Sequence, residues 1–205
     1  MPAKQNSLTE ELAIVGRSFH GRGWLRGSSG NFSVLLARKP TRLCITSAGD
    51  DIGDLDETNF LELDEDAEIL QGFGRPSDGS LLHLAIYRMR PRARCVLYSQ
   101  SVPGIILTDK NYVDGVLEFS GYEALASLDG IDRFDQSARV PIIDNSKDHV
   151  ALSHVIANVL SDDISAVGIF IRKHGLYTWG ETVKQARTNI EILEFLFEIA
   201  VNEKQ

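Results

Sequence analysis

The last forty residues constrain the fold most strongly, because they read as two neighbouring strands followed by a long amphipathic helix. Residues 166–172 and 176–179 are apolar runs separated by a short turn, which is typical of paired strands. Thr182 suits the N-cap of a helix that carries an apolar stripe up to Ile199. Such a helix buries its stripe against a sheet, so the chain is predicted to be an α/β protein.

The rest of the chain alternates between short strand-like runs and helical segments. Ser7 and Glu10 form a capping-box pattern at the start of the first helix. Helices are expected over residues 7–20, 80–90 and 121–128, and from Asn145 or Ser146 through Val159. Strands are expected over residues 31–36, 42–46, 60–63, 96–98 and 140–143, the last at a sheet edge because it contains Pro141.

Composition narrows the class of protein further. The chain has 205 residues, of which 43% are apolar and 24% charged, and this suits a single globular domain over residues 1–205. Its net charge of −8 argues against a nucleic-acid binder or an acidic-membrane binder, either of which needs a basic face. No leader-like segment or membrane-spanning run is visible, and Cys44 and Cys95 lie in apolar runs expected of buried, reduced thiols. A cytoplasmic protein is expected.

Three short segments carry residues suited to binding an anion. Ser28-Ser29-Gly30-Asn31 is a turn of small residues that lets a ligand approach the backbone closely, and Thr46-Ser47-Ala48-Gly49 ends a strand. Pro76-Ser77 lies just before a predicted helix, whose N-terminus favours a phosphate. Taken singly, each segment is explained equally well as an ordinary loop or helix cap.

Taken in this order, the segments resemble the class II aldolase/adducin-like family, and the resemblance extends over nearly the whole chain. Gly121-Tyr122-Glu123 and the long run from His174 to Gly180 also match. Within the family the chain is most similar to the methylthioribulose-1-phosphate dehydratase branch, which serves methionine salvage. The resemblance implies a three-layer α/β/α domain with a mostly antiparallel central sheet, a homotetramer, and a sugar phosphate as the small-molecule substrate.

The resemblance also implies a site. In the family three histidines hold a divalent metal, usually Zn²⁺, which polarises the substrate ketone so that a proton can leave the neighbouring carbon. A glutamate serves as acid and base while hydroxide departs. His174 matches the third metal ligand, and Glu123 matches the glutamate. The residues that match phosphate contacts are Ser29, Gly30, Asn31, Gly49 and Ser77.

Two departures from the family pattern fall on the metal ligands. Tyr98 and Gln100 occupy the positions of the other two histidines. A tyrosine must lose a proton with a pKa near 10 to ligate well, and a glutamine offers a neutral oxygen that suits hard cations better than zinc. Asp50 and the sequence Pro76-Ser77-Asp78-Gly79 also depart from the family and add negative charge near the expected phosphate.

Three readings follow from these matches and departures. The first is a dehydratase that uses a metal despite Tyr98 and Gln100, and the second is an inactive paralogue that binds a metabolite or a protein partner. The third is a metal-independent lyase in which Glu123 and Tyr98 act on the substrate as acid and base.

Of the remaining histidines, His20 is expected to be structural or a partner of the helix C-terminus, and His83 to be partly buried and hydrogen-bonded and not a ligand. His149 and His154 are five residues apart on one helix and do not share a face well, so neither is nominated as a site residue.

Overall fold

The computed structural model describes residues 3–26, 30–128, 131 and 136–203. Among them nine strands form a sheet in the order β4-β3-β2-β1-β5-β9-β8-β7-β6, with every neighbouring pair antiparallel except β7 and β8. The strands are β1 (Ser33–Arg38), β2 (Thr41–Thr46), β3 (Phe60–Leu63), β4 (Ile69–Gln71), β5 (Cys95–Ser99), β6 (Val116–Phe119), β7 (Ala138–Ile143), β8 (Gly168–Ile171) and β9 (Gly175–Gly180).

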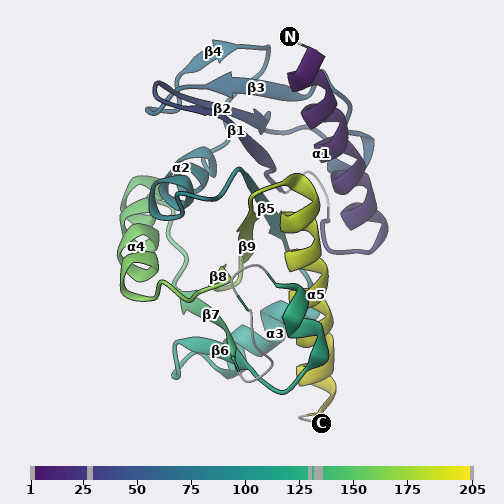
Figure 1. The fold of residues 1–205 in the computed structure, drawn as a ribbon, viewed down its shortest axis with the longest axis vertical. Coiled ribbons are helices and arrows are strands. Elements are labelled where there is room, and N and C mark those ends of the chain that lie inside the picture. The colour runs from purple at the N-terminus through teal and green to yellow at the C-terminus, as the bar shows by residue number, and fades with distance from the viewer. Residues whose placement is uncertain (1–2, 27–29, 129–130, 132–135, 204–205) are drawn as a thin grey trace.

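Helices cover both faces of this sheet, so the three-layer α/β/α prediction is confirmed (Figure 1). Helices α2 and α4 pack against each other on one side, while α1, α3 and α5 lie on the other. None of the described helices is both long enough and apolar enough to cross a membrane. The helices are α1 (Ala3–Gly21), α2 (Ser80–Met89), α3 (Val102–Lys110), α4 (His149–Asp162) and α5 (Val183–Glu203), with 3-10 turns η1 (Ile52–Asp54) and η2 (Glu123–Ser127).

The central strands β5, β8 and β9 are buried along their whole length. Helices on both sides cover them, which is why their sequences read as continuous apolar runs rather than alternating ones. The predicted pairing of the runs at 166–172 and 176–179 is confirmed as the antiparallel pair β8 and β9. Cys44 and Cys95 are both buried in the core, as predicted, and form no disulfide within the described residues.

Helix starts differ from the sequence prediction in two places. Helix α1 begins at Ala3, so Ser7 lies inside it and the predicted capping box is wrong; Ala3, Lys4 and Gln5 are good helix formers that extend the helix. Helix α4 is capped by Asp148, whose carboxylate accepts from the Ala151 N–H at 2.9 Å, and not by Asn145 or Ser146. The Ser146 hydroxyl instead accepts from the Asp148 N–H.

The predicted cap of the last helix is confirmed, because the Thr182 hydroxyl accepts from the Gln185 N–H at 3.1 Å. The prediction for Pro141 is wrong, since β7 lies between β8 and β6 and not at the edge. Its ladder with β6 ends at the pair Val116 and Pro141, where a missing N–H is tolerated. The helix expected over 121–128 is a short 3-10 turn, and β4, α3 and β6 were not predicted.

Candidate functional site

A pocket of about 240 Å³ opens where the N-terminal ends of α2 and α4 meet the turn between β8 and β9. Its walls include three residues from the sequence prediction, Asn31, Ser77 and His174. Arg75 and His149 also line it and were not predicted as site residues. The site therefore collects groups from separated segments of the chain.

The other predicted phosphate contacts are placed less directly. Gly30 precedes Asn31 with φ +139°, a conformation that other residues rarely adopt, and a Cβ there would lie 3.1 Å from Cδ2 of Leu25, so glycine is favoured at this position. Gly49, with φ +91°, does not line the pocket, although its neighbour Ala48 does. Ser29 lies outside the described residues.

The turn that carries His174 is held by its own main chain and by β5. The His174 N–H donates to the Ile171 carbonyl at 3.0 Å. The His174 carbonyl accepts two side-chain hydrogen bonds, from the Tyr98 hydroxyl at 2.8 Å and from the Gln100 amide at 2.7 Å. Thus the two residues at the expected metal-ligand positions both bind one main-chain oxygen.

The imidazole of His174 is fixed by aromatic neighbours. Its ring stacks on Tyr177 with ring centres 5.9 Å apart, and its Nε2 shares a hydrogen bond of 3.1 Å with the Tyr177 hydroxyl. Burial, followed by the charge of nearby His149, lowers the pKa of His174. The ring is therefore neutral at pH 7 and one nitrogen is already engaged, which suits it to hydrogen bonding with a ligand.

The residues at this position do not fit a zinc centre. Within the described part of the chain, three or more His, Cys, Asp or Glu side chains nowhere gather closely enough to hold a metal ion. Burial raises the pKa of Tyr98 and opposes the phenolate that ligation requires. The Gln100 amide contributes only a neutral oxygen, and zinc sites use nitrogen, sulfur and carboxylate donors. Of the three expected ligand positions, only the one at His174 carries a residue that zinc ordinarily uses.

The remaining features of the pocket suit a small anion. Helix α2 begins at Ser80 after Gly79, and no side chain caps its first N–H groups. The N–H groups of Ser80 and Leu82 donate to the main-chain carbonyls of Ser77 and Gly79, so the helix contributes mainly its positive end. That positive end favours a phosphate, as does the Arg75 guanidinium, which lines the pocket. Asp78 opposes it, because this acidic residue lines the same pocket, as predicted. Asp50 does not line the pocket and instead accepts a hydrogen bond from the Ser47 hydroxyl.

Asn31 and Gly79 are packed so closely that each limits the other. A Cβ at residue 79 would lie 2.5 Å from Oδ1 of Asn31, well inside any tolerated contact. The Ser77 hydroxyl accepts from the Gly79 N–H at 3.2 Å and closes the turn before α2. The side chain of Asn31 thus fills the space that a larger residue at position 79 would need.

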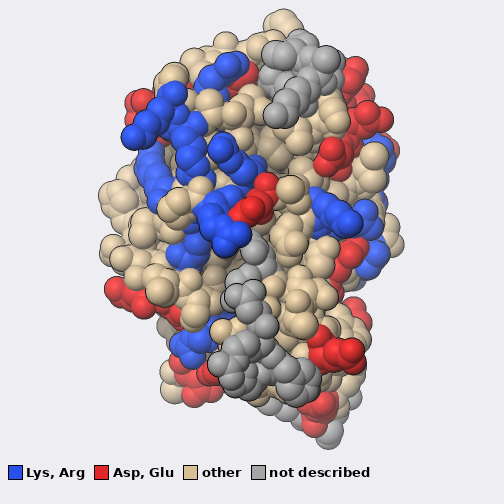
Figure 2. Space-filling model, viewed as in Figure 1, with Lys and Arg blue, Asp and Glu red and all other residues tan. Residues whose placement is uncertain are grey.

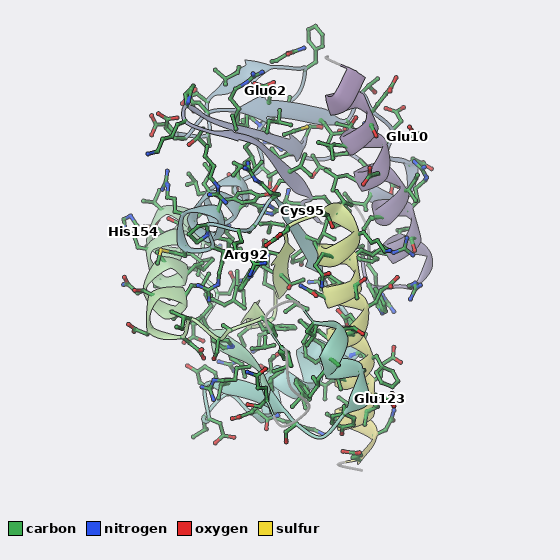
Figure 3. The ribbon with its side chains drawn as sticks, viewed as in Figure 1. Glu10, Glu62, Arg92, Cys95, Glu123 and His154 are labelled. Atoms are coloured by element: carbon green, nitrogen blue, oxygen red, sulfur yellow. The ribbon has the colours of Figure 1, made fainter. Side chains whose placement is uncertain are left out.

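Glu123 lies elsewhere in the chain. It is exposed on η2, which packs against α5 on the side of the sheet opposite α2 and α4 (Figure 3). It does not line the pocket, so one chain does not bring the predicted acid/base residue to His174. His154 also lies outside the site, exposed on α4.

His83 supports the floor of the pocket. The prediction of a partly buried residue was wrong in degree, because the side chain is fully buried and its pKa falls to about 3 through burial. Its Nδ1 shares a hydrogen bond of 2.7 Å with the Ser33 hydroxyl, which lies 2.9 Å from the Tyr87 hydroxyl. Its ring meets Tyr177 edge to face at 5.5 Å, so it positions the tyrosine beneath His174.

Comparison with known proteins gives consistent results. The family profile described as Class II Aldolase and Adducin N-terminal domain matches residues 10–201. A methylthioribulose-1-phosphate dehydratase from Pseudomonas fluorescens is 34% identical over 198 residues, covering 97% of this chain and 94% of that protein. One from Methylococcus capsulatus is 35% identical over 189 residues, covering 92% and 90%.

Solved structures share the fold. The YgbL protein from Escherichia coli gives a TM-score of 0.70 at 28% identity, covering 96% of this chain and 89% of that one. An L-fuculose-1-phosphate aldolase from Thermus thermophilus gives 0.76 at 20% identity, covering 100% and 97%.

Proposed function

The chain belongs to the class II aldolase and adducin family, and from that premise we propose that it binds a ketose phosphate without using a metal to dehydrate it. The ligand is of the methylthioribulose-1-phosphate type, which the names of the sequence relatives support. Its place is the pocket between α2, α4 and His174. The protein then acts as a metabolite-binding member of a family of lyases.

One observation carries the proposal: the His174 carbonyl accepts hydrogen bonds from both Tyr98 and Gln100. To ligate a metal as a phenolate, Tyr98 would have to give up the proton that it donates to this oxygen, while Gln100, whose amide nitrogen holds the same oxygen, could offer only a neutral Oε1. Losing the Tyr98 hydrogen bond costs about 0.5–1.5 kcal/mol, and the raised pKa of Tyr98 adds the cost of ionising a buried phenol. The bonded arrangement therefore opposes a zinc ion at this place.

The groups that remain support binding of the phosphate end. The Arg75 guanidinium, the Ser77 hydroxyl and the positive N-terminal end of α2 are the groups that attract a phosphate at one end of the pocket. The imidazoles of His149 and His174 lie at the other end and suit the hydroxyl groups of a sugar. This arrangement orients a ketose phosphate, but apart from Asp78 on the rim it places no carboxylate of the described residues beside the ligand to move a proton.

Calorimetric titration with methylthioribulose 1-phosphate, with and without a chelator, tests the proposal. We expect binding that the chelator does not change, no stoichiometric zinc after dialysis against Zn²⁺, and no dehydration of the ligand. Arg75→Gln should weaken binding by about 10–100-fold, the value of one charge-assisted hydrogen bond. Arg187→Gln, on α5 and paired with Glu191 there, is the matched control and should bind as the parent does.

A second variant tests whether the two missing histidines alone prevent the site from binding zinc. Tyr98→His combined with Gln100→His supplies the two missing imidazoles, and we expect this protein to take up zinc when the parent does not. Stoichiometric zinc in the parent, together with turnover of the sugar phosphate, would overturn the proposal in favour of a working dehydratase.

A further inference from the structure

A second pocket, of about 200 Å³, lies between the β1–β2 turn and the C-terminal half of α2. None of its lining residues belongs to the first pocket. Three cationic side chains surround an apolar floor, and the residues are Arg38, Lys39 and Arg88 around Leu35, Leu84 and Tyr87. We propose that this pocket binds a small organic anion that carries an apolar group next to its phosphate or carboxylate.

The positive charge of this pocket is not neutralised by the described part of the chain. The Arg38 guanidinium donates to the main-chain carbonyls of Tyr87, Arg90 and Ala93, none of which carries a net charge. Arg88 likewise donates to the main-chain carbonyl of Glu65 at 2.8 Å. Within the described ranges, Arg38, Lys39 and Arg88 form no salt bridge with a carboxylate. Their charges stay available on a protein whose net charge is −8.

Other cations reinforce the field around the pocket. Figure 2 shows a band of Lys and Arg side chains over α2 and the neighbouring strands. Burial and, next, the charge of Arg94 lower the pKa of Arg38. Arg90 and Arg92 have other roles, since Arg90 donates to the last carbonyls of α4 and Arg92 pairs with Glu181.

The floor of the pocket defines the uncharged part of the ligand. Leu35 and Leu84 are buried apolar residues, and the Tyr87 hydroxyl is turned inward to Ser33, so the floor presents carbon atoms. An apolar cavity of about 150 Å³ holds a benzene ring, so 200 Å³ has room for a group of that size. A flat ring or short chain carrying one anionic group matches both the floor and the rim.

A compact anion fits the surroundings better than a long polyanion. The acidic turn at residues 64–68 lies beside Arg88, because the Glu65 carbonyl accepts its hydrogen bond. A nucleic acid that crossed the cationic band would approach those carboxylates and be repelled. The charged side chains that line the pocket, and that a ligand confined to it would meet, are all cations.

Phenyl phosphate is the probe, titrated into the full chain by calorimetry and followed by amide NMR shifts. We expect it to bind more tightly than inorganic phosphate or phenol, since only phenyl phosphate uses both floor and rim. Lys39→Gln combined with Arg88→Gln should weaken its binding by at least about tenfold. Both side chains are exposed, so the variant should fold. Lys110→Gln combined with Lys184→Gln removes the same charge from exposed sites elsewhere and should change nothing.

Further outcomes would overturn the proposal. If Arg75→Gln abolished the binding while the Lys39 and Arg88 variant left it intact, phenyl phosphate would occupy the first pocket. If inorganic phosphate bound as tightly as phenyl phosphate, the apolar floor would contribute nothing and the binding would be unspecific charge attraction. If a short oligonucleotide bound more tightly than phenyl phosphate, the ligand would be a polyanion and not a compact anion. None of these results depends on the fate of methylthioribulose 1-phosphate at the first site.

Discussion

The double hydrogen bond to the His174 carbonyl makes a quantitative prediction about stability. Tyr98→Phe removes one donor and leaves the Gln100 amide in place. Gln100→Met removes the other donor, keeps the length of the side chain, and leaves the Tyr98 hydroxyl. Each single substitution loses one net hydrogen bond while the oxygen keeps a partner, so each should lower the free energy of unfolding by about 0.5–1.5 kcal/mol.

The double variant should lose more than the sum of the two. It leaves the carbonyl with no donor, which adds a desolvation penalty of about 1–3 kcal/mol for a buried oxygen. His174 is half-buried, so water reaches part of the turn and the lower end of this range applies. We therefore expect a coupling free energy of about 1 kcal/mol, which corresponds to an extra fall in Tm of about 2–4 °C for a chain of this size.

Urea unfolding of the parent, both single variants and the double variant measures this coupling. Tyr112→Phe is the control, because its hydroxyl bonds to Asp144 on an exposed surface and its loss should change stability little. Additivity of the two changes within about 0.5 kcal/mol would show that the two donors are not partners of the same oxygen.

Three further predictions follow from buried groups and close contacts. Burial raises the pKa of Glu194 to about 7 against an ordinary value of 4.5, so the folded chain keeps this proton up to a higher pH than the unfolded chain does. The free energy of unfolding should therefore fall as pH rises from 4.5 to 7, by up to about 3 kcal/mol. Glu194→Gln should remove that slope in unfolding curves measured across this range. His83 acts in the opposite sense: its stabilising contribution is present above pH 6.5 and is lost as pH falls towards 3, and His83→Gln should flatten the acid limb of the same curves. Gly175→Ala would place a Cβ 2.6 Å from Cε2 of Tyr98 and should cost about 2–3 kcal/mol in thermal unfolding; Gly21→Ala, which meets nothing within 4 Å, is its control and should not destabilise the chain.

The parts of the fold that the sequence predicts well are those with a strong local pattern. The strand at 60–63 has the predicted bounds, and the last helix starts directly after Thr182. Strand β4 was missed because its three residues are all exposed and show no alternation. Helix α3 was missed because Val102-Pro103-Gly104 resembles a turn, although proline is well suited to a helix start.

From the sequence, a residue of the candidate site could be predicted only where it lies in a run that matches the family. His174, Asn31 and Ser77 belong to runs that match the family, and the structure brings all three to one pocket. His149 has no such run, and its relevance comes from the packing of α4 beside α2, which is a contact between distant segments. Arg75 has a weak local signal, since it directly precedes Pro76-Ser77, but only the turn before α2 shows that it reaches the pocket rim.

Without a metal ion, the pocket has little net positive charge with which to bind the phosphate of the ligand. A divalent ion would bring two positive charges to the phosphate, and His174 alone does not hold one. What remains is Arg75 against Asp78, which largely cancel, and the N-terminal end of α2, because the Asp148 carboxylate already caps α4. A helix end contributes about 0.3–1 kcal/mol and is screened by salt. The ketose phosphate should therefore bind weakly and lose affinity as ionic strength rises. The affinity of a substrate held by a metal would instead fall mainly when a chelator is added. Repeating the calorimetric titration at low and high salt distinguishes the two sources of affinity.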